Sequence, residues 1–71
     1  MTDKEKLQWI DTVSLAIREM SYKGTIAHHQ AERINEFAEG IRLMTRMPDS
    51  FIDKNKEHFD RIFNEAKVIN T

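Results

Sequence analysis

The chain has 71 residues, of which 39% are hydrophobic and 32% charged, with no cysteine and a formal net charge of -1. A chain of this length forms one small domain whose hydrophobic core gives only marginal stability. Because the chain has no cysteine, neither disulfides nor zinc sites with thiolate ligands can stabilise it. The interspersed charges argue against a nucleic-acid partner, and no apolar run approaches the roughly 18 residues of a membrane span.

The first predicted element is a helix over residues 3–22. Thr2 is followed three residues later by Glu5, which is the spacing of a capping box. Gly24 is expected to end this helix in a left-handed backbone conformation. The apolar residues recur at steps of three and four, which is the period of a helix with one buried face: Leu7, Ile10, Val13, Ile17 and Met20.

The second predicted helix covers residues 25–46, with Thr25 as its N-cap. Pro48 ends it, because proline cannot continue a helix and also restricts the residue before it. The expected buried stripe of this helix consists of Ile26, Ala27, Ala31, Ile34, Phe37, Ala38, Ile41 and Met44.

The third predicted helix covers residues 51–69, and Ser50 with Asp53 is expected to cap it. Three helices of similar length joined by short connections pack as antiparallel neighbours. We therefore expect residues 1–71 to form a single all-α domain, a small antiparallel three-helix bundle that dimerisation would complete.

Two adjacent histidines lie among glutamates on the second helix, a combination that raises the question of a metal site. Successive helical residues turn by about 100°, which places this group on the side opposite Ile34. A surface pair such as His28 with Glu32 supplies two ligands where a structural zinc site needs four. We expect a solvated polar stripe, with no metal and no cofactor, consisting of His28, His29, Glu32, Glu36 and Glu39.

Paired acids occur at the same spacing on two helices, as Glu36-x-x-Glu39 and Glu57-x-x-Asp60. This arrangement resembles the ExxE…ExxD pattern of the all-α nucleoside triphosphate pyrophosphohydrolases of the MazG type. The resemblance implies magnesium ions held by the four acids and bound to the substrate's phosphates. The helical period instead turns Glu36, Glu39 and Glu57 away from the core faces. The pyrophosphohydrolase activity is therefore the alternative function, and no catalytic residue is assigned.

Several apolar residues do not fit the buried stripes, namely Trp9, Leu15, Tyr22, Leu43 and Met47. In one interpretation, a tilted bundle absorbs Leu43 and Met47 while Trp9 covers a loop. In the other, these residues form an interface for helix–helix contacts. The expected function is that of a small non-enzymatic, cytoplasmic interaction or regulatory module. It would present a helical surface to a protein partner or to itself as a homodimer, and not to nucleic acid or a membrane.

Overall fold

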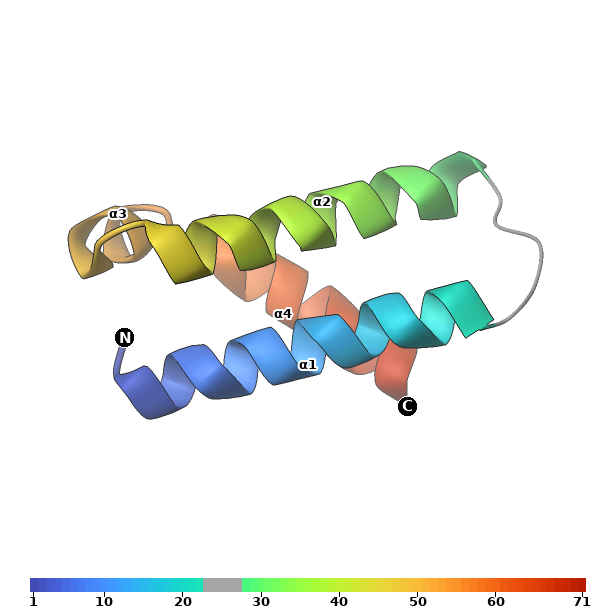
Figure 1. Cartoon of the computed structure of the whole chain (residues 1–71), viewed down its shortest axis with the longest axis horizontal. Helices are drawn as coiled ribbons and strands as arrows, with labels where there is room; N and C mark the ends of the chain where they lie inside the picture. The colour runs from blue at the N-terminus through green and yellow to red at the C-terminus, as the bar shows by residue number, and fades with distance from the viewer. Residues whose placement is uncertain (23–27) are drawn as a thin grey trace.

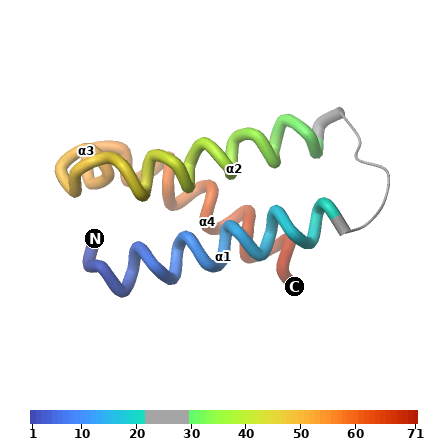
Figure 2. Tube along the Cα trace, viewed as in Figure 1, coloured from blue at the N-terminus to red at the C-terminus, as the bar shows by residue number. Residues whose placement is uncertain are grey.

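The protein is a small all-α bundle in the computed structural model, which describes the backbone of residues 1–22 and 28–71 and the side chains of residues 1–21 and 30–71. The helices are α1 (Asp3–Tyr22), α2 (His28–Arg46), α3 (Asp49–Lys54) and α4 (Lys56–Asn70). α1 and α2 run antiparallel, and α4 crosses on one side of them (Figure 1). The Cα trace shows the same arrangement (Figure 2). The predicted antiparallel helical bundle is thereby confirmed.

The start of α1 follows the predicted capping box. The backbone N–H of Glu5 donates to Oγ1 of Thr2 over 3.1 Å, and the backbone N–H of Thr2 donates to Oε1 of Glu5 over 3.0 Å. Two backbone donors at the helix start, which have no partner inside the helix, are satisfied in this way. The predicted helix-ending Gly24 and the predicted cap Thr25 both lie outside the described residues.

The third predicted helix is divided at Asn55, which was not expected. The side chain of Asn55 donates from Nδ2 to the carbonyl oxygen of Phe51 over 2.9 Å, and its backbone N–H donates to Phe51 and Ile52. Its own carbonyl oxygen accepts from the first turn of α4. Asparagine competes for backbone groups in this way and interrupts helices, a local effect that the apolar period does not reveal.

The predicted cap of the third helix is also wrong. α3 begins at Asp49, and Pro48 occupies the N-cap with extended backbone angles and no side-chain cap. Because the helix begins earlier than predicted, Ser50 already lies within its first turn. Asp53 instead pairs with the Met1 amino group at 3.1 Å, and Asp49 pairs with Lys6. These two ion pairs join α3 to the start of α1.

The core lies between α1, α2 and α4. α1 packs extensively against both α2 and α4, whereas α2 and α4 contact each other little. Leu7 was expected in the core but is 68% exposed. The buried direction of α1 passes through Trp9 and Val13, and Leu7 lies to one side of it. The buried apolar side chains are Trp9, Val13, Ala16, Met20, Phe37, Met44, Ile52, Phe59, Ile62 and Ala66.

Trp9 and Gly40 determine how closely α1 and α2 approach each other. Nε1 of Trp9 donates to the carbonyl oxygen of Phe59 over 2.9 Å, which holds the indole in one orientation. Its ring also packs edge-on against the Phe59 ring, with centroids 5.6 Å apart. A Cβ atom at Gly40 would stand 2.9 Å from Cη2 of Trp9 and 3.3 Å from Cδ1 of Ile62. Glycine is therefore required in the middle of α2 by close packing.

Candidate interaction surface

A second stripe runs along each of α1 and α2, beside the buried one. Both stripes advance by three and then four residues, which keeps their members on one side of each helix. We call the two stripes together the outer face. On α1 it consists of Leu7, Ile10, Ser14, Ile17 and Ser21, and on α2 of Ala31, Ile34, Ala38, Ile41 and Thr45.

The outer face lies on the side of the α1–α2 pair that is turned away from α4. On α1, Trp9 and Thr12 both contact α4, and the Thr12 carbonyl oxygen accepts from Asn70 over 3.1 Å. On α2, the contact is made at Glu36, which pairs with Arg61. At about 100° per residue, Thr12 and Glu36 are opposite the outer face on their own helices, and Trp9 lies about 120° from it. Within the part of the chain that the structure describes, no helix covers this face.

The outer face is partly open to solvent. Its four isoleucines are half-buried against the core, whereas Leu7, Ser14, Ala38 and Thr45 are exposed. Between the start of α1 and the end of α2 the face is hollowed into a shallow groove lined by Asp3, Lys6, Leu7, Ile10, Met44 and Thr45. This groove presents mainly apolar surface, and Leu7 is its most exposed hydrophobic side chain.

Charged residues flank the outer face, and Asp3 continues the α1 stripe at its start, whereas the ten positions of the two stripes carry no charge. The solvent side of α1 carries Asp11 and Arg18, and that of α2 carries Arg42. Almost a third of the chain is charged, so ten consecutive stripe positions without a charge form a distinct surface. Single exposed apolar residues are ordinary, whereas a continuous apolar surface with a polar rim is typical of a contact site.

The structure removes Trp9 from the predicted interface. Its side chain is 2% exposed and belongs to the core, because α1 packs against two helices and needs a wide apolar arc. Leu43 is half-buried against the same core, and Met47 is half-buried after the end of α2. Leu15 is 42% exposed but lies outside the outer face. The Tyr22 side chain is outside the described residues.

Sequence reasoning missed Leu7 and Ala38 as surface residues. Ala38 was expected in the buried stripe of the second helix but is exposed, as are Ser14 and Ser21 on α1. The available signal was the second stripe itself, since the residues from Leu7 to Ser21 repeat at the same spacing as the core stripe beside them. The period shows that two stripes exist but not which of them is covered.

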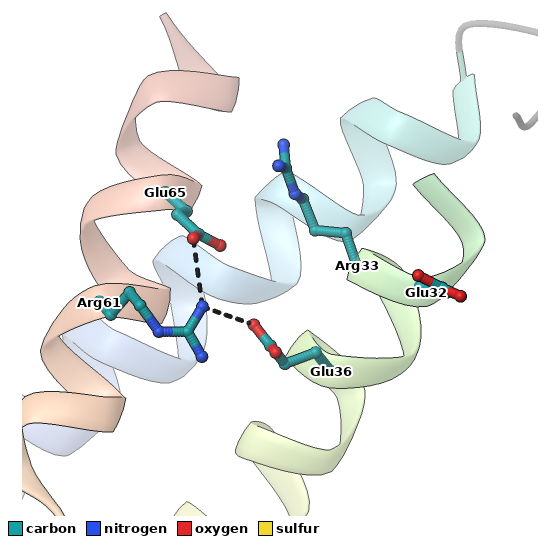
Figure 3. A pocket seen from close by; sticks show the side chains of 5 residues that line it. All are labelled: Glu32, Arg33, Glu36, Arg61 and Glu65. Carbon is teal, nitrogen blue, oxygen red and sulfur yellow. Dashed lines mark hydrogen bonds and ion pairs between the residues drawn. The ribbon is translucent and has the colours of Figure 1, made fainter. Parts of the chain in front are cut away.

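A charged cluster lies in the open angle between α2 and α4 (Figure 3). Nη1 of Arg61 is 3.2 Å from a carboxylate oxygen of Glu36 and 3.2 Å from one of Glu65. The hydrogen bond to Glu36 is the main cause that raises the pKa of the Arg61 guanidinium above its usual value. Glu32 and Arg33 line the same hollow. These pairs are exposed, and such pairs typically add little stability.

The four acids of the pyrophosphohydrolase-like pattern are not brought together. Glu36 is bound to Arg61, and Asp60 pairs with Lys56 on its own helix at 3.0 Å. Glu39 and Glu57 are exposed. Among the described residues, no group of three or more histidines and acids is placed to hold a metal ion. The side chains of His28 and His29 lie outside the described residues.

No described helix combines the length and the apolar character that a membrane crossing requires. No family model matches the chain, and no curated protein or solved structure matches it either. The case for a function therefore depends on the surfaces of this protein alone, and the outer face is the most distinctive of them.

Proposed function

We propose that the protein is a small non-enzymatic interaction module of the cytoplasm, which regulates or assembles by presenting the outer face to a protein surface. The observation that carries this proposal is the uncharged double stripe on α1 and α2 opposite α4. One side of the α1–α2 pair is covered by α4, and the other side is left for a partner.

The energetics of the outer face favour association. Fully burying a leucine side chain contributes about 1.5–3 kcal/mol, so covering Leu7, which is 68% exposed, is worth roughly 1–2 kcal/mol. The half-buried isoleucines of both helices would add to this. Apolar residues at three- and four-residue spacing are the anchors that helices use when they pack into grooves. The charged residues around the face would keep the free protein in solution.

The experiment is a site-specific photo-crosslink in the source cell. A benzoyl-phenylalanine at Ser14, in the middle of the outer face, should give one discrete covalent adduct after illumination. The matched control carries the same group at Asn64, which is exposed on α4 away from the face, and should give none. If Ser14 gives no discrete adduct, or gives the same adducts as Asn64, the outer face is not an interaction surface.

A further inference from the structure

We propose that the outer face binds a second copy of this chain, as a two-fold dimer in which the two α1 helices cross antiparallel. This inference rests on the proposed function and names the partner. Ser14 and Ala38 lie at the symmetry axis of the dimer. Three features of the chain support this dimer: the spacing of the face, the charges beside it and the surface area.

The spacing of both stripes suits pairing with an antiparallel copy of itself. On α1, Ser14 has Ile10 four residues before it and Ile17 three residues after it. On α2, Ala38 has Ile34 and Ile41 at the same two distances. When a stripe packs against an antiparallel copy of itself about its small residue, each isoleucine contacts an isoleucine of the other copy. The small residue then contacts the same small residue of the other copy. In a two-fold interface residue i contacts residue j and j contacts i, as this pattern allows.

The two small residues lie at the same height on the α1–α2 pair. Leu7 shares the apolar groove with Met44 and Thr45, which sets the register of the antiparallel helices. Ser14 lies seven residues after Leu7, and Ala38 lies seven residues before Thr45, so they are level. One axis can therefore pass through both positions. Small residues at the crossing let helix backbones approach closely, while larger residues pack on either side.

The charged residues beside the α1 stripe can pair with the same residues of an antiparallel copy of α1. Asp11 lies three residues before Ser14 and Arg18 lies four residues after it. An antiparallel copy places Asp11 of each chain beside Arg18 of the other, which makes two equivalent ion pairs. Neither residue forms an ion pair within the described residues. Complementary charges at an interface fix its register more than its affinity.

The other two-fold arrangement places α1 of one copy over α2 of the other, and it makes the same number of flanking ion pairs. Asp11 would then lie near Arg42, but Arg18 would lie near the uncharged Asn35. At the end of the face, Lys4 would lie near Arg46, a repulsive pair. The reversed α1 pairing leaves Arg42 beside Asn35 of the other copy in the same way, so the Lys4–Arg46 repulsion is the reason that we choose the reversed α1 pairing.

The surface area of the chain is consistent with a covered face. The protein exposes 5048 Å², whereas a compact monomer of 8.4 kDa exposes about 4600 Å². The molecule is also elongated, with extents of 38 × 20 × 18 Å. Pairing along the long side would bury part of this surface and enlarge a core that is small for an independent domain.

The first test uses a single cysteine, since the chain has none of its own. Ser14→Cys places two thiols at the axis, where a disulfide needs Cα atoms about 4.4–6.8 Å apart. Mild oxidation of the purified protein should convert Ser14→Cys to a covalent dimer. Asn64→Cys, equally exposed but on α4, should stay mostly monomeric. Equal yields from the two variants would overturn the proposal.

The second test reverses the flanking charges and measures dimerisation by light scattering over a concentration series. Asp11→Arg and Arg18→Asp each create two like-charge contacts, and each should raise the dimer Kd about tenfold or more. The double variant restores opposite charges and should return to within about threefold of the parent. If dimerisation is restored instead by combining Asp11→Arg with Arg42→Asp, the reversed α1 pairing is wrong. A parent protein that stays monomeric at high concentration would overturn the dimer itself.

The photo-crosslink in the source cell separates this inference from the proposed function. An adduct of twice the chain mass at Ser14 supports the second copy. An adduct of another mass, together with a monomer in light scattering, overturns the dimer and leaves the interaction module standing. The absence of any discrete adduct overturns the proposed function itself.

Discussion

Replacing Gly40 with alanine tests how tightly α1 and α2 are packed. Two opposing effects act at this position. Alanine is about 1 kcal/mol better than glycine in a helix interior, because it loses less backbone entropy on folding. The added methyl group would stand 2.9 Å from Cη2 of Trp9, a distance that requires the ring or the helix to shift.

The clash is expected to outweigh the gain in helix propensity. The indole of Trp9 is 2% exposed and held by its hydrogen bond to Phe59, so it has little freedom to move. The second close atom is the end of the flexible Ile62 side chain, which can move at lower cost. Overpacking a filled core costs about 1–3 kcal/mol. The net effect of Gly40→Ala should be a destabilisation of about 1 kcal/mol, within a range of roughly 0–2.

The measurement is urea unfolding followed by circular dichroism at 222 nm. The midpoint should fall while the slope of the transition stays unchanged, because the unfolded surface is the same. Thermal unfolding should show a Tm lower by about 4–8 °C for each kcal/mol in a domain of this size. The matched control is Glu39→Gly, at an exposed position of the same helix outside the outer face, which should lose slightly less than about 1 kcal/mol through propensity.

A second substitution identifies the clash as the cause. Trp9→Phe removes the Cη2 atom and also the hydrogen bond to Phe59, so this variant alone should be destabilised. In the Trp9→Phe background, Gly40→Ala should become stabilising, because the main clash is gone and the end of the Ile62 side chain can move at low cost. Equal effects of Gly40→Ala in both backgrounds would show that the two residues are not coupled. A more stable Gly40→Ala single variant would refute the close packing of α1 on α2.

Two further predictions concern the acidic residues. Hydrogen bonding by the Thr2 backbone N–H lowers the pKa of Glu5 below its usual value, so the ionised form stabilises the fold. That contribution is complete above the unfolded pKa, about 4.3, and is lost as the pH falls through the lower folded pKa. Glu5→Gln should therefore lose less stability than the parent between about pH 5 and pH 3, and equal losses in acid titrations of the Tm would contradict the role of Glu5. Separately, the purified protein with magnesium should not hydrolyse a nucleoside triphosphate in a phosphate-release assay, because its paired acids are dispersed. Turnover that disappears in both Glu36→Ala and Glu57→Ala would establish the pyrophosphohydrolase alternative.

Which parts of the fold are predictable depends on how local their causes are. The capping box at Thr2 and Glu5 acts within one turn, and it is observed as predicted. The break at Asn55 is also local, but it depends on a side-chain hydrogen bond to Phe51 that competes with helix formation. The apolar period continues through the break, so the period alone predicted one helix where there are two.

The sequence predicted that α1 and α2 carry an apolar surface outside the core, but not which residues form it. The sequence alone determined that α1 and α2 are helices with more apolar residues than one buried stripe requires, because helical spacing is set within each segment. Which stripe becomes the core depends on where α4 crosses, and that is a contact between distant parts of the chain. The crossing buries Trp9, leaves Leu7 exposed and leaves the outer face on the side away from α4. Only the tertiary structure could decide this, since the two stripes carry the same periodic signal and differ only in which neighbour covers them.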